Sequence, residues 1–187
     1  MLKYPNMKPY YYTRIVFIII LAMSSSSSFA ATPGVLFHVT QVNDGNTISI
    51  RTKSFIGIPL KIERVRLIGI DAPELKQEQW GRLAKKYLKK IVSENCWVVN
   101  IEFDVQQRDR DGRLVAYLWN KKGELINEKL LEAGYAVLSP SPPNVKYADR
   151  LAVAEKRARS EMAGIWKKGG LKQTPEEWRK KHQKQYR

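Results

Sequence analysis

Residues 62–74 read IERVRLIGIDAPE, an aliphatic stretch that runs into an acidic turn. The β-branched and aliphatic residues at its start predict a strand over residues 62–70. Pro73 ends regular strand pairing, because it lacks a backbone N–H and restricts the conformation of the residue before it. The sequence therefore predicts that the chain turns here and presents the carboxyl groups of Asp71 and Glu74 at the end of a strand.

The phase of this strand poses a geometric problem. Successive side chains of a strand point to opposite faces, so Arg66 and Asp71 are expected on opposite faces. Gly69 lies between them and is a candidate for a bulge that resets the alternation.

Four further strands are predicted around this segment. Asp44-Gly45 separates the first two, and Asp111-Gly112 precedes the last; an Asp-Gly pair between strand patterns is a strong signal for a tight turn. The four strands cover residues 35–40, 47–52, 97–103 and 114–119. Together with residues 62–70 they make five short strands.

Helices are predicted after the third strand and after the last one. Apolar residues recur at spacings of three and four over residues 80–92, with lysines between them, which is typical of an amphipathic helix. Two more helices are predicted over residues 125–133 and 145–162, and each ends near a glycine. This order favours an α+β fold built on a small closed barrel, and an oligonucleotide-binding barrel is the commonest such plan.

The composition limits both the chemistry and the partners. The chain of 187 residues contains 33 Lys and Arg against 18 Asp and Glu, which gives a formal net charge of +15. This charge favours a polyanionic partner, either nucleic acid or an acidic membrane surface. The single Cys excludes an intramolecular disulfide, and one Cys with two His supports no thiolate or His-rich metal site. Metals with oxygen ligands are the easiest to accommodate.

Residues 1–30 have the pattern of a secretory signal peptide. Three basic residues and a short apolar run at residues 15–23 precede small residues, so cleavage is expected after Ala30. The apolar run is about half of the roughly 20 residues that span a bilayer, which argues against a permanent membrane anchor. We therefore expect an exported protein, either secreted or periplasmic.

The rest of the chain divides into a domain and a basic tail. The folded domain is expected over residues 31–166, and residues 167–187 contain eight Lys or Arg against two Glu. Within the tail, Thr174 followed by Pro175 predicts the start of a short helix. The tail is either a solvated end or, as we favour, a segment that binds nucleic acid without reading its sequence.

Charged residues cluster at predicted strand ends and turns, over residues 43–47, 66–74 and 108–113. Hydrolysis of a phosphodiester needs a hard cation or positive side chains on the phosphoryl oxygens, together with an activated water. A Ser-His-Asp triad is disfavoured, because one His lies near the start of the domain and the other in the tail. Glycosidic chemistry by two carboxylates suits a cationic surface less well, and no Gly-rich phosphate loop supports a nucleoside triphosphatase.

Four motifs resemble those of the staphylococcal nuclease (thermonuclease) family. In the family's order and spacing, they read VRLIGIDAPE at 65–74, DRDGRLVAY at 109–117, NEKL at 127–130 and GIW at 164–166. The resemblance extends from about Val35 to Trp166 and implies a five-stranded oligonucleotide-binding-type β-barrel with about three helices. It also implies a calcium-dependent nuclease that hydrolyses phosphodiester bonds of DNA and RNA with little sequence specificity and leaves 3′-phosphates.

The resemblance also implies roles for individual residues. Arg66 and Arg113 would bind the phosphate, and Glu74 would orient or deprotonate the attacking water. Asp71 and the backbone carbonyl of Ala72 would bind Ca²⁺. These roles suit the residue types, because a guanidinium presents a planar fork to phosphate oxygens and calcium prefers oxygen ligands.

The sequence departs from the family pattern in two places. In the family's Asp-Gly-Asp-Thr motif the second Asp binds calcium, and Asn46 stands at that position here. Asn46 still offers an oxygen ligand but removes one negative charge, so weaker calcium binding is expected. The loop at residues 139–144 carries Ser and Pro where tyrosines contact the nucleotide in the family's best-known member. Arg108 and Arg110 are expected to help hold the polyanionic substrate.

Two other functions stay open from the sequence. One is an oligonucleotide-binding module that keeps the barrel but is catalytically weak or inactive, which the change at Asn46 motivates. The other is a membrane-surface protein, which rests on charge alone. The sequence implies no stable protein partner, and a monomer is expected.

Overall fold

The computed structural model describes residues 36–52 and 61–182. The predicted signal peptide at residues 1–30, with its cleavage position, lies outside the described residues. Among the residues that are described, no helix has the length and apolar character needed to cross a membrane.

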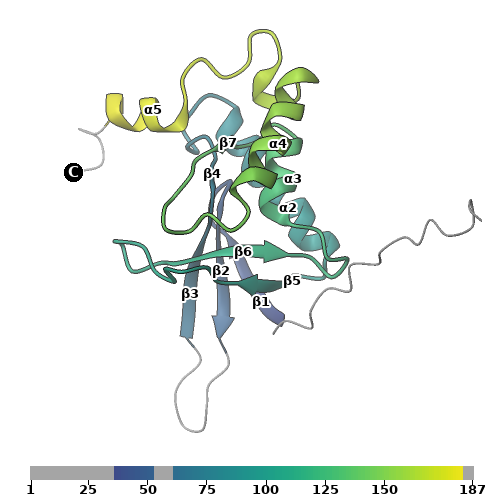
Figure 1. The fold of residues 1–187 in the computed structure, drawn as a ribbon, viewed down its shortest axis with the longest axis vertical. Coiled ribbons are helices and arrows are strands. Elements are labelled where there is room, and N and C mark those ends of the chain that lie inside the picture. Colours follow the sequence, from purple (N-terminus) through teal and green to yellow (C-terminus); the bar gives the residue numbers. More distant parts are fainter. Residues whose placement is uncertain (1–35, 53–60, 183–187) are drawn as a thin grey trace, which may run out of the picture. The chain divides into compact units, whose positions relative to one another are not determined.

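Five strands form a closed barrel (Figure 1). They are β1 (Leu36–Val42), β2 (Thr47–Thr52), β3 (Lys61–Leu67), β5 (Val98–Glu102) and β6 (Leu114–Trp119). Their order around the barrel is β1-β2-β3-β6-β5, and neighbours are antiparallel except for β3 and β6, which are parallel. The α+β fold with a five-stranded closed barrel is therefore confirmed.

The strand predicted over residues 62–70 is wrong as a single strand, because it divides into two. β3 ends at Leu67, and Gly69 has a left-handed backbone with a φ of 78°. The chain resumes as β4 (Ile70–Asp71), which pairs with β7 (Val137–Leu138) in a separate two-stranded sheet. The turn at Gly69 therefore moves the chain from the barrel to a different pairing partner.

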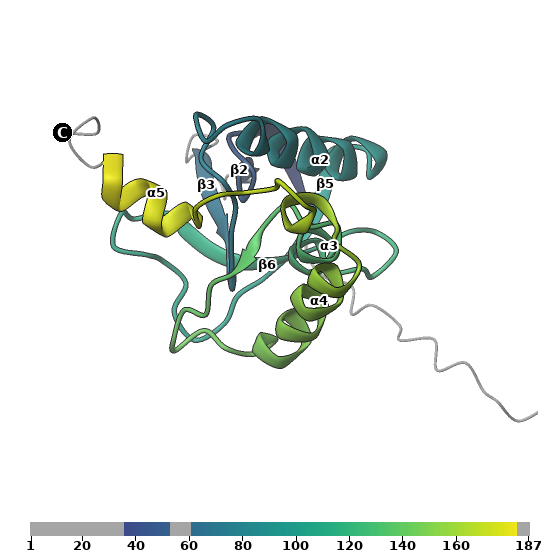
Figure 2. The same cartoon turned by 90° about the horizontal axis from the view of Figure 1, so that it is seen from above.

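Four α-helices lie within the described residues. They are α2 (Trp80–Glu94), α3 (Ile126–Glu132), α4 (Ala148–Ser160) and α5 (Pro175–His182), and a short 3-10 helix follows α4 at Gly164–Trp166. The first three match predicted helices, although α4 is shorter at both ends than expected, and α5 confirms the helix predicted from the tail. Helix α3 contacts both α2 and α4, whereas α5 lies apart from α3 and α4, on the side of the barrel that carries β3 and β4 (Figure 1, Figure 2).

Helix α2 shows how the sequence pattern produces the packing. Its buried residues Ala84, Leu88 and Ile91 recur at spacings of three and four, so one face of the helix packs on the barrel while lysines cover the other. These side chains join the aliphatic residues of the strands in one hydrophobic core. Each fully buried aliphatic side chain contributes about 1.5–3 kcal/mol to folding. The helix is therefore firmly attached, which matters because the acidic turn precedes it.

A buried asparagine links α3 to the strands. Asn127 has no exposed surface; its side-chain Nδ2 donates to the carbonyl of Ile68 at 2.8 Å, and its Oδ1 accepts from the backbone N–H of Leu118 at 3.0 Å. Ile68 lies in the turn between β3 and β4, and Leu118 lies in β6. Asn127 therefore holds the turn that leads to the acidic residues.

We expect Asn127→Ala to lower the free energy of unfolding by about 2–4 kcal/mol. The change leaves a buried backbone N–H and a buried carbonyl unpaired, and each loss costs about 1–3 kcal/mol. Urea unfolding followed by circular dichroism measures the effect, with Lys156→Ala at an exposed position of α4 as the control. A loss below about 1 kcal/mol would mean that neither backbone group depends on Asn127.

Candidate active site

Arg66 and Asp71 meet on one side of the chain, contrary to the alternation of a continuous strand. The Nη2 atom of Arg66 donates to Oδ1 of Asp71 at 2.7 Å, and the Asp71 side chain is 5% exposed. The turn at Gly69 explains this contact, because it breaks the alternation between β3 and β4. The phase reset predicted at Gly69 is confirmed, in the form of a break between two strands.

The turn between β1 and β2 lies against the same region. A Cβ atom placed at Gly45 would lie 2.6 Å from the Cβ of Ala72, so this close approach requires glycine. The adjacent Asn46 is buried; its Oδ1 accepts from Nη1 of Arg66 at 3.3 Å, and its Nδ2 donates to the carbonyl of Ile70 at 3.2 Å. The tight packing at Gly45 therefore brings the Asn46 amide beside Arg66 and β4.

Glu74 is positioned by the start of helix α2. A Cβ atom at Gly81 would lie 1.9 Å from the carbonyl oxygen of Glu74, so the helix can pack on this backbone only because position 81 is glycine. The side chain of Gln77 also accepts a hydrogen bond from the backbone N–H of Glu74 at 3.2 Å. Both backbone polar groups of Glu74 are thus in close contact with α2 or the turn before it, which orients its half-buried carboxyl group.

A third arginine, Arg179 of helix α5, bridges the two carboxylates. Its Nη1 donates to Oε1 of Glu74 at 2.9 Å and to Oδ1 of Asp71 at 3.2 Å, and its Nη2 donates to Oδ2 of Asp71 at 2.6 Å. Burial by itself lowers the pKa of Arg179, but the bonds to Asp71 and Glu74 outweigh burial and raise this pKa above its ordinary value. The two carboxylates therefore converge on one group that stays positively charged.

The sequence patterns did not reveal the contacts that Arg179 and Gln77 make with the acidic turn. Gln77 is buried, and its Nε2 donates to the carbonyl of Gln173 at 2.7 Å, which ties the tail to the turn that holds Glu74. The capping signal at Thr174 predicted the helix correctly. It carries no information about which carboxylate an arginine will meet across 105 positions of sequence.

Arg113 lies on the loop before β6 and is paired with two acids of that loop. Its Nε donates to Oδ2 of Asp109 at 2.8 Å, and its Nη2 lies 2.8 Å from Oδ2 of Asp111. Asp109 and Arg66 line one cavity of about 150 Å³, together with serines of the 139–144 loop. Arg113 therefore adjoins this cavity through Asp109, whereas Arg66 lines it directly.

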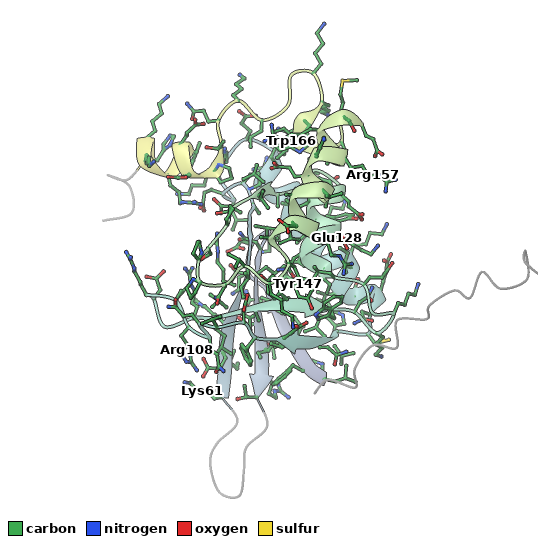
Figure 3. The ribbon with its side chains drawn as sticks, viewed as in Figure 1. Lys61, Arg108, Glu128, Tyr147, Arg157 and Trp166 are labelled. Atoms are coloured by element: carbon green, nitrogen blue, oxygen red, sulfur yellow. The ribbon has the colours of Figure 1, made fainter. Side chains whose placement is uncertain are left out.

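The two arginines expected to hold the substrate lie on the same loop. Arg108 forms two hydrogen bonds of 3.2 Å with the carboxylate of Glu63 on β3, close to Lys61 (Figure 3). The bonds from Arg108 and Lys61 lower the pKa of Glu63, so this carboxylate stays ionised near neutral pH. Arg108 is thus engaged in an ion pair with β3, and Arg110 is exposed to solvent.

The side chains of Asp71 and Glu74 converge on one positive group, the guanidinium of Arg179. Carboxylate oxygens are also the ligands that hard divalent cations prefer in proteins. In the part of the chain that the structure describes, no group of three or more Asp, Glu, His or Cys side chains is arranged to hold a metal ion. The cluster described above contains two carboxylates, those of Asp71 and Glu74.

Comparisons with known proteins identify the family of this chain. The model of the family of staphylococcal nuclease homologues matches residues 64–168. The chain is 33% identical over 135 residues to the thermonuclease of Staphylococcus hyicus, with 70% of this chain and 75% of the relative covered. It is 34% identical over 140 residues to the thermonuclease of Staphylococcus intermedius (72% and 78% covered) and 34% identical over 134 residues to an endonuclease of Bacillus subtilis (68% and 59% covered). The chain therefore belongs to the staphylococcal nuclease family.

Proposed function

We propose that this chain is an exported nuclease that hydrolyses phosphodiester bonds of DNA and RNA with little sequence specificity, depends on calcium and leaves 3′-phosphates. The observation that carries the proposal is the cluster in which Arg66 meets Asp71 and both Asp71 and Glu74 converge on a positive charge. Relatives named thermonuclease and endonuclease support the same activity. The net charge of +15 suits a polyanionic substrate, because phosphate contacts supply most nonspecific affinity.

The proposal includes the organisation expected from the sequence. Residues 1–30 would direct export and be removed after Ala30, so the active protein would begin at residue 31. Residues 31–166 would form the catalytic domain and residues 167–187 the basic tail. The protein would act as a monomer, with no stable protein partner and no membrane anchor.

Arg66 and Arg113 would bind the phosphate that is attacked. A guanidinium stays protonated and offers paired N–H donors, so it stabilises the negative charge that grows on the phosphoryl oxygens in the transition state. Arg66 lines the cavity that it shares with Asp109. Arg113 would give up its ion pair with Asp111 and bind the phosphate instead. Arg108 and Arg110 would contact phosphates of the nucleic acid next to the one that is attacked.

Glu74 would orient the attacking water and accept its proton, since a carboxylate near the phosphate-binding arginine fits the role of a general base. Asp71, Asn46 and the backbone carbonyl of Ala72 would hold calcium. When bound there, the ion supplies positive charge to the phosphoryl oxygens and to the attacking water. The protein side chains then have separate roles in binding, orientation and proton transfer.

A catalytically weak nucleic-acid-binding module is the second candidate, and two observations favour it. Asn46 stands where a carboxylate would strengthen metal binding, and Arg179 occupies the two carboxylates that are present. Such a module would bind nucleic acid in a salt-sensitive manner and create no new ends.

We expect Glu74→Gln to reduce cleavage by about a hundredfold or more while leaving the affinity for DNA nearly unchanged. An amide keeps the shape of the side chain but cannot accept the proton of the attacking water. Cleavage of single- and double-stranded DNA is followed with calcium or with excess chelator, and affinity by fluorescence anisotropy. Glu78→Gln, an exposed change four positions away, is the matched control.

Calcium-dependent cleavage that disappears in Glu74→Gln and survives in Glu78→Gln supports the nuclease and the role of Glu74. Folded wild-type protein that binds DNA and produces no new ends at millimolar calcium would instead establish the binding module.

Arg66→Ala and Arg113→Ala are each expected to lower the cleavage rate by at least about a hundredfold, the usual effect of losing one transition-state donor. Arg157→Ala is the control, because this exposed arginine of α4 pairs with Glu161, four positions along the chain. Single-turnover rates at saturating calcium provide the measurement. If both variants cleave at nearly the wild-type rate, the assignment of the phosphate site is wrong.

Asn46→Asp is expected to tighten calcium binding by about tenfold or more, because it adds a carboxylate to the ligand set. Isothermal titration calorimetry of the two proteins measures the change. Asn43→Asp tests for a general effect of charge in the same turn, since Oδ1 of Asn43 serves as an acceptor for Ser49 and an aspartate keeps that bond. Equal or weaker binding by Asn46→Asp would mean that this side chain does not face the ion.

A further inference from the structure

The end of the described chain contacts the carboxylates to which the proposed function assigns metal binding and water activation. Arg179 forms three hydrogen bonds of 2.6–3.2 Å with Asp71 and Glu74. Oδ1 of Asp71 also accepts from Arg66, so both oxygens of this carboxylate are engaged by guanidinium groups. The negative charge of the site is therefore neutralised from within the chain.

A divalent cation that binds these carboxylates is repelled by the guanidinium of Arg179. Calcium binds carboxylate oxygens at about 2.3–2.6 Å. The Arg179 nitrogens lie 2.6–3.2 Å from the same atoms, so a bound ion would lie within a few ångströms of a full positive charge. Arg179 and the ion therefore compete for these carboxylates, because binding of either one weakens binding of the other.

Specific contacts hold the segment against the site. The buried Gln77 donates to the carbonyl of Gln173 at 2.7 Å. Thr174 and Glu177 form a reciprocal capping box: the Thr174 N–H donates to Oε2 of Glu177 at 2.8 Å, and the Glu177 N–H donates to Oγ1 of Thr174 at 3.2 Å. These bonds define where α5 begins and so direct Arg179 toward the carboxylates.

Helix α5 has two features that favour its release from the carboxylates, its short length and its small buried surface. α5 has eight residues, whereas isolated helices shorter than about 12–15 residues are marginal in water. Pro175 is the one buried residue of the helix. The polar contacts of Arg179 and Gln77 contribute to the docking of α5, and a competitor for the carboxylates removes those of Arg179.

We propose that residues 173–182 are an intramolecular brake on this site: Arg179 occupies the cation position at Asp71 and Glu74, and calcium must displace it before the site becomes active. This inference rests on the proposed function, because it concerns the same metal site. In the proposed brake, calcium binds the undocked molecules. The apparent Kd for calcium is therefore the intrinsic Kd divided by the fraction of molecules that are undocked. The brake therefore sets the calcium concentration at which the site is filled.

Calcium titration of the full chain by isothermal titration calorimetry tests the brake. Arg179→Gln is expected to lower the apparent Kd by about threefold or more, because it removes the docked competitor. Lys180→Gln is the matched control: it removes the same charge from the same helix, but Lys180 pairs with Glu176 at 2.7 Å. No gain in Arg179→Gln, or an equal gain in both variants, would overturn the proposal. Circular dichroism verifies that both variants are folded.

Amide hydrogen exchange supplies a readout that is independent of cleavage. Saturating calcium is expected to raise exchange at residues 175–182 of the wild-type chain, with α4 as the internal reference. Unchanged exchange in α5 would mean that the helix stays docked when the ion binds, and the brake would be excluded.

The two proposals fail in different ways. If the wild-type chain and both variants bind no calcium, the metal site of the proposed function is wrong, and the brake falls with it. If the wild-type chain cleaves DNA in a calcium-dependent manner and Arg179→Gln has unchanged affinity, the nuclease stands and only the brake is excluded.

Discussion

At Gly69 the backbone adopts a left-handed turn and passes from the barrel strand β3 to the short strand β4. A side chain here would be strained at a φ of 78° and would also lie 2.6 Å from Leu151 of α4. If the strand continued without this turn, Arg66 and Asp71 would point to opposite faces. Because the turn brings them together, the ion pair at 2.7 Å forms, and Arg179 binds the same carboxylate.

Charge balance at Asp71 links the stability of the fold to its function. A carboxylate that is 5% exposed needs positive partners and hydrogen bonds, since a buried unpaired charge is strongly destabilising. Arg66 supplies them from the barrel and Arg179 from the end of the described chain. The divalent cation proposed above would meet the same requirement. The pairing with Arg179 is thus one way to compensate a buried negative charge.

Two glycines set how closely the supporting elements approach this charge. Gly45 lets the turn after β1 pack on Ala72, and Gly81 lets the first turn of α2 pack on the carbonyl of Glu74. Both contacts are too short for any larger residue without a backbone shift. The site is therefore held by rigid packing of a turn and a helix on either side of the acidic segment.

The sequence by itself determined the strands of the barrel, the Asp-Gly turns, the amphipathic α2 and the start of α5, because periodicity and capping act over a few neighbouring residues. The family motifs predicted Arg66, Asp71 and Glu74 as site residues. Tertiary structure decided the division of residues 62–70, the pairing of β4 with β7, and the docking of Arg179 on carboxylates 105 and 108 positions away. These contacts depend on the path of the chain through space and on the charges that this path brings together, which no local pattern records.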